Sequence, residues 1–181
     1  MSSSSYYTRR SIPSDAHWIL ETTARVQAAL TASGSLQELA NSSLDKVHTS
    51  IQNEYVFIFQ DVVNNKLLGA VTISLFCPEA GYGSSDWGIR SSGKKWYLHS
   101  LLLEPAYQGQ GLGVLFLKEA LSLFRAGEGV GVVVLDCWAG NGKLRSFYER
   151  VGFVLHGEFP EEDYYITVFA LKLDRETMQN G

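Results

Sequence analysis

The sequence predicts an α/β protein in which one mixed sheet carries helices. Short segments rich in aromatic and β-branched residues alternate along the chain with longer segments whose apolar residues recur at helical spacing. One apolar strand runs directly into a glycine-rich turn and a helix, and the chain ends in two neighbouring strand-like segments, 153–158 and 164–173. Their short connection predicts that these last two strands form an antiparallel pair.

The first half of the chain is expected to form a strand, two helices and a hairpin. Pro13, Ser14 and Asp15 are typical of a helix start. Asn64 and Asn65 favour a hairpin turn, because Asn tolerates a positive φ. In chain order we expect a strand at 6–10, helices at 16–30 and 36–51, and strands at 55–63 and 67–76.

The second half of the chain begins with a segment, 78–95, that is rich in glycine and serine and predicts a long loop. A strand at 96–103 leads from this loop into the glycine-rich turn. The turn is followed by an apolar helix at 112–123 and a buried strand at 130–137.

The glycine-rich turn, in residues 101–113 (LLLEPAYQGQGLG), predicts an anion-binding loop. Gly109, Gly111 and Gly113 allow several backbone N–H groups to point into one concavity without obstruction by Cβ atoms. The helix that opens there adds N–H groups without intrahelical partners and the positive end of its dipole. A phosphate or pyrophosphate is therefore the expected ligand, and a plain turn between a strand and a helix is the alternative.

Two common glycine loops do not fit these residues. A dinucleotide fingerprint that starts at Gly109 requires glycine at position 114, where the chain has Val114. A Walker loop requires Gly-Lys-Ser/Thr at its end, which this turn lacks.

A second segment, 135–153 (LDCWAGNGKLRSFYERVGF), predicts a strand end, a break and a new helix. Its apolar residues fall at positions i, i+3, i+4 and i+7 of one helical face. Gly152 stands where a left-handed C-terminal cap belongs. Leu144, Phe147, Tyr148 and Val151 form this apolar face.

Together the two segments resemble the GNAT-type N-acetyltransferases. Gln108, Gly111 and Gly113 match the pattern of that family's acetyl-CoA pyrophosphate loop, Arg or Gln, two residues, Gly, one residue, Gly or Ala. The later segment resembles the second signature of the family, with Leu144 at a position that usually holds Ala. The resemblance implies a GNAT-like fold, with a mixed, mostly antiparallel sheet of about six to seven strands flanked by about four helices.

The resemblance also implies an activity. A GNAT-type enzyme moves an acetyl group from acetyl-CoA, its donor substrate, to a primary amine of a small molecule, amino acid derivative or peptide, within a ternary complex and without a metal. Two alternatives are a non-catalytic acyl-CoA-binding regulatory module on the same fold and a nucleotide-binding protein of another fold. Tyr148 favours the enzyme, because a binding module needs no acid near the coenzyme sulfur.

The coenzyme-binding residues are those that match the family at the strand, the turn and the second signature. In the family, the pantetheine arm lies alongside the strand before the turn, and a backbone N–H of that strand holds the acetyl oxygen. We expect the coenzyme to contact Leu101, Leu102, Leu103, Gln108, Gly109, Gln110, Gly111, Leu112, Gly113, Asn141 and Tyr148. Asn141 has the plainer interpretation of a helix N-cap.

The resemblance makes Tyr148 the candidate acid that protonates the departing thiolate, with a core aromatic as the alternative. Asp136 is the first candidate for the base that deprotonates the amine, because it is an acidic residue in an otherwise apolar strand. Glu104 and His99 are the alternative bases. Asp136 could also be an ordinary strand-end carboxylate, Glu104 an exposed loop residue and His99 a core histidine.

Composition and charge limit the remaining function classes. The 181 residues are 45% hydrophobic and contain no apolar run long enough for a membrane span, so we expect one domain at 6–175, a disordered leader at 1–5 and a tail at 176–181. The net charge of −4 argues against nucleic-acid binding. Cys77 and Cys137 suggest neither a disulfide framework nor a zinc site. We expect a cytoplasmic monomer or homodimer, with a nuclear location left open.

Acidic residues also cluster between the last two strands, at a turn that borders the acceptor cleft in this family. They would attract a cationic amine, although a solvated acidic turn is the plainer interpretation. The residues are Glu158, Glu161, Glu162 and Asp163.

Overall fold

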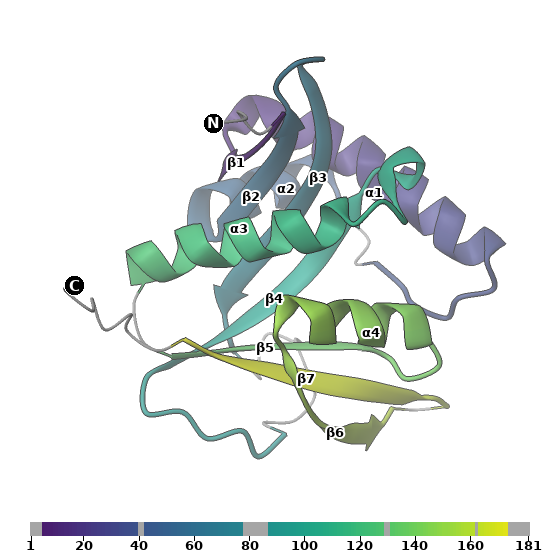
Figure 1. The fold of residues 1–181 in the computed structure, drawn as a ribbon, viewed down its shortest axis with the longest axis vertical. Coiled ribbons are helices and arrows are strands. Elements are labelled where there is room, and N and C mark those ends of the chain that lie inside the picture. The colour runs from purple at the N-terminus through teal and green to yellow at the C-terminus, as the bar shows by residue number, and fades with distance from the viewer. Residues whose placement is uncertain (1–4, 40–41, 78–86, 129–130, 162, 174–181) are drawn as a thin grey trace.

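The computed structural model describes residues 5–39, 42–77, 87–128, 131–161 and 163–173. Its centre is a seven-stranded sheet with the order β1-β2-β3-β4-β5-β7-β6 (Figure 1). The strands are β1 (Tyr6–Arg10), β2 (Tyr55–Asp61), β3 (Lys66–Leu75), β4 (Lys94–Leu103), β5 (Gly131–Trp138), β6 (Val154–Pro160) and β7 (Tyr165–Leu173). The α-helices are α1 (Ala16–Ala32), α2 (Leu44–Asn53), α3 (Leu112–Glu128) and α4 (Gly142–Val151).

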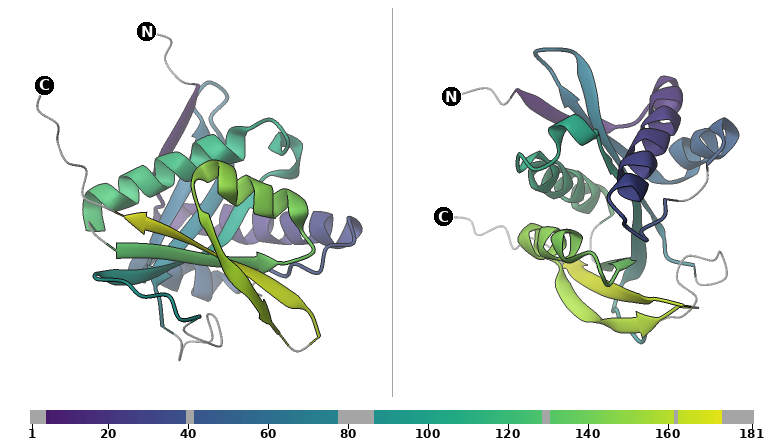
Figure 2. Two further views of the ribbon diagram at one scale, coloured as in Figure 1. Left: turned by 60° about the horizontal axis from the view of Figure 1, so that its bottom comes forward. Right: turned by 90° about the vertical axis from the view of Figure 1, so that its right-hand side faces the viewer.

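The sheet is mixed, as the sequence predicts. The pairs β1–β2, β2–β3, β3–β4, β5–β7 and β6–β7 are antiparallel, and β4–β5 is parallel. Helices α3 and α4 cover one face, and α1 and α2 cover the other (Figure 2). A parallel pair needs a long crossover, and α3 provides it between β4 and β5.

The largest core cluster lies between the sheet and helices α3 and α4. Phe116 of α3 is fully buried there, and its ring stacks on that of Phe59 of β2 with the ring centroids 5.1 Å apart. Gly69 of β3 makes this approach possible, because a Cβ atom there would lie 3.2 Å from the Phe116 ring and 2.8 Å from the carbonyl oxygen of Leu102. The contact fixes α3 against the centre of the sheet.

Most of the predicted elements are confirmed with shifts of a few residues at their ends. The predicted helix at 36–51 is wrong at its start, because α2 begins at Leu44, where the Ser43 side chain accepts a hydrogen bond from the Lys46 N–H. The preceding residues make other contacts: the N–H of Leu39 donates to Gln27 Oε1 at 2.7 Å. Part of the predicted 78–95 loop, residues 78–86, lies outside the described residues.

Replacing Phe116 with Ala tests how much the α3 contact stabilises the fold. We expect the free energy of unfolding to fall by about 3–5 kcal/mol in urea titration, because a buried ring leaves a cavity that the sheet cannot fill. Leu123→Ala is the matched control on the same helix, since that side chain is 46% exposed. Equal losses in the two variants would contradict this description of the core.

Candidate active site

The candidate active site lies where β4 and β5 diverge (Figure 1). Their parallel ladder pairs Lys94–Tyr97 with Gly131–Val134, and β4 then continues along β3 as far as Leu103. A register shift opposite Ala70 and Thr72 marks a bulge in β4, where Ser100 has a φ of 50°. Beyond Tyr97, the edge of β4 that faces β5 is therefore available to an extended ligand.

The glycine-rich turn follows directly after this edge and forms an open backbone cradle. Gly109 and Gly111 have φ values of 77° and 79°, which favour glycine, and a Cβ atom at either position would meet nothing within 4 Å. Gln108 Nε2 donates to the carbonyl oxygen of Leu103 at 2.9 Å, and Gln110 Nε2 donates to that of Ala106 at 3.0 Å. These two bonds fix the turn against its own backbone and keep the glutamine side chains on the loop.

Helix α3 starts at Leu112, so its first N–H groups, which have no intrahelical acceptor, adjoin the cradle. Gly113 lies in this first turn, where a Cβ atom would come within 3.1 Å of the Phe147 ring on α4. Its position thus allows α3 and α4 to pack closely at the cradle. Together the open glycines and the helix start fit a pyrophosphate group.

Asn141 and Gly152 bound helix α4: Asn141 has the plainer of its two interpretations, the N-cap, and Gly152 is the predicted C-terminal cap. Asn141 Oδ1 accepts a hydrogen bond from the Leu144 N–H at 3.0 Å, which is the N-cap contact. Gly152 has a φ of 117° and ends the helix in the left-handed region. The two caps set the start and the end of the helix that carries Tyr148.

Tyr148 is a buried aromatic residue in the core cluster beneath α3 and α4, with 5% of its surface exposed. Its ring lies against those of Phe147, Phe153 and Phe169. Burial raises the pKa of the phenol, and the nearby Cys137 and Asp136 raise it further. The hydroxyl therefore stays protonated around neutral pH, as a general acid requires.

Asp136 faces the opposite side of the sheet from that core, because it alternates along β5 with Leu135 and Cys137. Its Oδ1 accepts a hydrogen bond from the Tyr97 hydroxyl at 2.5 Å. Burial raises the pKa of the carboxyl group; the Tyr97 bond lowers it, and the charge of Glu161 raises it. The net direction is upward, which makes the carboxylate a better proton acceptor.

His99 and Glu104, the alternative bases, have other partners. His99 stacks on the Tyr97 ring with centroids 5.6 Å apart, and burial lowers its pKa to about 4, so it is neutral at pH 7. Glu104 accepts from Arg25 Nη2 at 2.6 Å and from the Thr22 hydroxyl at 3.1 Å. Glu104 thereby connects the end of β4 to helix α1.

Sequence reasoning missed Tyr97 and Gln37. Tyr97 alternates with apolar residues on β4, and nothing in the sequence indicated a bond to Asp136. Gln37 Oε1 accepts from the Trp138 N–H at 2.7 Å and so ties the segment before α2 to the end of β5. Both contacts join segments far apart in the chain.

A surface hollow of about 420 Å³ lies elsewhere, between β1, β2 and α3. It is lined by Tyr7, Thr8, Arg9, Arg10, Tyr55, Phe57, Leu123 and Gly127. None of these residues belongs to the glycine-rich turn or to the Tyr97–Asp136 pair. We assign the candidate site from the chemistry of the turn and of β5, because the hollow lacks both.

Comparison with known proteins identifies the family. Residues 23–153 match the sequence model of the acetyltransferase (GNAT) family, and the chain belongs to this family. A curated relative from Bacillus subtilis (strain 168), the uncharacterized N-acetyltransferase YesJ, is 30% identical over 119 residues. The alignment covers 66% of this chain and 63% of the relative, so the chain spans less than two thirds of that protein.

Solved structures with a similar fold confirm the predicted architecture. The ribosomal-protein-S5-alanine acetyltransferase from Vibrio fischeri superposes with a TM-score of 0.71 at 15% identity, covering 97% of both chains. The putative acetyltransferase yncA from Salmonella typhimurium, solved with its cofactor acetyl-CoA, gives a TM-score of 0.68 at 16% identity, covering 94% of this chain and 95% of that one. The alternative of a nucleotide-binding protein with another fold is thereby excluded.

Two further properties concern the described part of the chain. None of its helices is both long and apolar enough to cross a membrane. Within the same residues, no group of three or more His, Cys, Asp and Glu side chains is placed to hold a metal ion. Cys77 is exposed and Cys137 is buried, and both are free thiols.

The raised pKa of Asp136 predicts that its charge costs stability. The folded state binds this proton more tightly than the unfolded state. The contribution of Asp136 to the free energy of unfolding therefore falls as pH rises above the ordinary carboxyl pKa of 3.8. At pH 7, Asp136→Asn should raise the thermal midpoint, and the gain should shrink as pH falls toward 3.8. Asp163→Asn, at an exposed position, is the control and should give no such gain. A lower midpoint for Asp136→Asn at pH 7 would contradict the assigned direction.

Proposed function

We propose that this protein is an enzyme that transfers an acetyl group from acetyl-CoA to a primary amine of a small molecule, amino acid derivative or peptide, directly within a ternary complex. One observation carries the proposal. The buried phenol of Tyr148 and the carboxylate of Asp136 lie on opposite faces of β5 just beyond its last paired residue with β4, and the glycine cradle follows at the end of β4. An acid and a base beside a thioester site are what acetyl transfer to an amine requires.

Acetyl-CoA would be the donor substrate, held by backbone groups along β4 and the cradle. The edge of β4 at Leu101–Leu103 offers hydrogen bonds to an extended pantetheine arm, and one of its N–H groups would stabilise the oxyanion. The first turn of α3, with Gly109 and Gly111, would bind the pyrophosphate. We include Gln108, Gln110, Leu112, Gly113 and Asn141 in this site as residues that shape the turn and the start of α4.

Asp136 would take a proton from the ammonium form of the acceptor, directly or through a water molecule. The neutral amine nitrogen then attacks the acetyl carbon, and collapse of the tetrahedral intermediate breaks the C–S bond. Tyr148 would give its proton to the departing thiolate. Glu104 is the alternative base in this proposal, although its carboxylate is engaged by Arg25.

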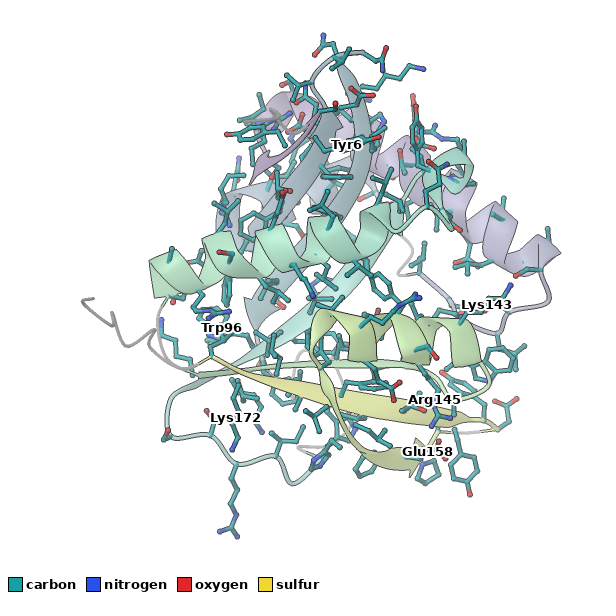
Figure 3. The ribbon with its side chains drawn as sticks, viewed as in Figure 1. Tyr6, Trp96, Lys143, Arg145, Glu158 and Lys172 are labelled. Atoms are coloured by element: carbon teal, nitrogen blue, oxygen red, sulfur yellow. The ribbon has the colours of Figure 1, made fainter. Side chains whose placement is uncertain are left out.

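A cationic acceptor is supported by the acidic groups near Asp136. Tyr164, in the β6–β7 connection, has a raised pKa, caused first by burial and then by carboxylates from three segments of the chain. These carboxylates are Glu161, Asp136, Glu38 and Asp163. The charge of Glu158, by contrast, is paired, because its carboxylate forms an ion pair with Arg145 of α4 at 3.0 Å (Figure 3). The remaining acidic groups would attract an ammonium group toward β5.

The proposal extends to the domain organisation, the compartment and the oligomeric state. We propose that residues 6–175 act as one domain in the cytoplasm, where free thiols such as Cys77 and Cys137 persist. The domain would work as a monomer or homodimer, without nucleic acid or a metal. The nuclear location remains the second compartment compatible with free thiols.

The direct test is a panel of primary amines with acetyl-CoA, with thiol release as the readout. The panel should include diamines, amino acid amides and peptide N-termini. Turnover with at least one amine supports the enzyme. Binding of acetyl-CoA without turnover on any amine would favour the non-catalytic acyl-CoA-binding module, and absence of binding would contradict both functions.

Tyr148→Phe separates catalysis from packing, because it removes the hydroxyl and keeps the ring. We expect kcat to fall on the order of 100-fold, while KM for acetyl-CoA changes little. Tyr165→Phe on β7, where the side chain is 58% exposed, is the matched control and should leave both constants unchanged. Wild-type turnover in Tyr148→Phe would show that Tyr148 is a core aromatic only.

A further inference from the structure

We propose that Tyr97 is a positioning residue for the reaction: its hydroxyl holds the Asp136 carboxylate in place where β4 and β5 diverge. The inference rests on the proposed role of Asp136 as the base. Tyr97 would not contact either substrate. It would act through Asp136.

The strand register brings these two residues together. Tyr97 and Val134 form the last pair in the β4–β5 ladder, and Asp136 lies two residues further along β5. Because side chains alternate along a strand, Val134 and Asp136 point to the same face as Tyr97. The Tyr97–Asp136 hydrogen bond, 2.5 Å between Oη and Oδ1, therefore joins the two strands just beyond their last backbone pair.

The Tyr97 ring is itself held by its neighbours. His99 stacks on it at an interplanar angle of 18°, and the rings of Phe76 and Trp87 lie 6.2 and 6.4 Å away, centroid to centroid. Trp87 is 5% exposed, so this packing is part of the core cluster on that face. A phenol fixed in this way donates from a constant direction.

This arrangement assigns different work to the two carboxylate oxygens. Oδ1 accepts the Tyr97 bond. We assign Oδ2 as the oxygen that takes the proton from the acceptor. A hydrogen bond to the charged form favours ionisation, so Tyr97 offsets part of the desolvation that raises the pKa of Asp136. The net shift of the Asp136 pKa remains upward.

Several other titratable groups face Asp136 or its direct neighbours. Burial keeps His99 neutral above its pKa of about 4 and raises the pKa of the Cys137 thiol to about 12. Neither group therefore changes charge over about pH 5–9. Among the described residues these groups are Tyr97 and His99 on β4, Cys137 on β5, Arg145 and Tyr148 on α4, and Glu161 and Tyr164 in the β6–β7 connection.

The test is the titration of Asp136 itself, followed by NMR of protein labelled with ¹³C at the aspartate carboxyl groups. The Asp136 signal is identified by its absence in Asp136→Asn. Tyr97→Phe keeps the ring and removes the donor, so the midpoint of this signal should move up by about one pH unit. Tyr7→Phe, 54% exposed on β1 at the far end of the sheet, is the control and should leave the midpoint unchanged.

Kinetics with the fastest amine of the panel provide the second measurement. The ascending limb of kcat/KM should shift upward in Tyr97→Phe by as much as the NMR midpoint. The double variant Tyr97→Phe/Asp136→Asn should be no slower than Asp136→Asn alone, because Tyr97 acts only through the carboxylate. Losses that multiply in the double variant would overturn the positioning role.

The possible outcomes distinguish a failure of the positioning role of Tyr97 from a failure of the base role of Asp136. An unchanged NMR midpoint in Tyr97→Phe overturns the inference, whatever the kinetics of Asp136→Asn show. A shifted midpoint together with full activity of Asp136→Asn would overturn the base role of Asp136 and with it the positioning role. A shifted midpoint, a shifted limb and non-additive losses together support it.

Discussion

The divergence of β4 and β5 is the constraint on which the rest of the site depends. Two parallel strands that stayed paired would satisfy each other's backbone groups and leave no edge for a ligand. Here the ladder ends at Tyr97 and Val134, and the bulge at Ser100 turns β4 toward the glycine cradle. In the function that we propose, backbone groups of this one continuous segment would bind a cofactor arm and a phosphate group, with no particular side chain required beyond glycine at the turn.

The proposed acid and the proposed base lie on opposite faces of the sheet at this divergence. Tyr148 belongs to the core under α3 and α4, whereas Asp136 lies on the side of Tyr97, Phe76 and Trp87. Burial raises the pKa of both groups, because it disfavours the charged form of each. It keeps the phenol protonated and makes the carboxylate more basic. One physical effect would thus prepare the two groups for the opposite proton transfers that we propose.

Features of the fold and the site that depend on neighbouring residues could be predicted from the sequence, whereas contacts between distant residues could not. The glycine-rich turn and the left-handed Gly152 follow from local chemistry and were predicted, and the N-cap at Asn141 was the plainer of its two interpretations. The start of α2 was wrong because Gln37, seven residues earlier, is bound by the distant Trp138. The Tyr97–Asp136 bond joins residues 39 positions apart and was missed because periodicity gives the face of a strand but not the partner across it.

Amide hydrogen exchange with and without acetyl-CoA tests the central claim, that the divergent edge of β4 and the glycine cradle together form the coenzyme site. Protection should appear at residues 98–103 and 108–113 on addition of acetyl-CoA, and it should be lost in Gly111→Val, whose side chain would occupy the open cradle. The hollow around Tyr7, Tyr55 and Leu123 provides the internal comparison. Protection confined to that hollow, with no change at β4 or the cradle, would contradict the account.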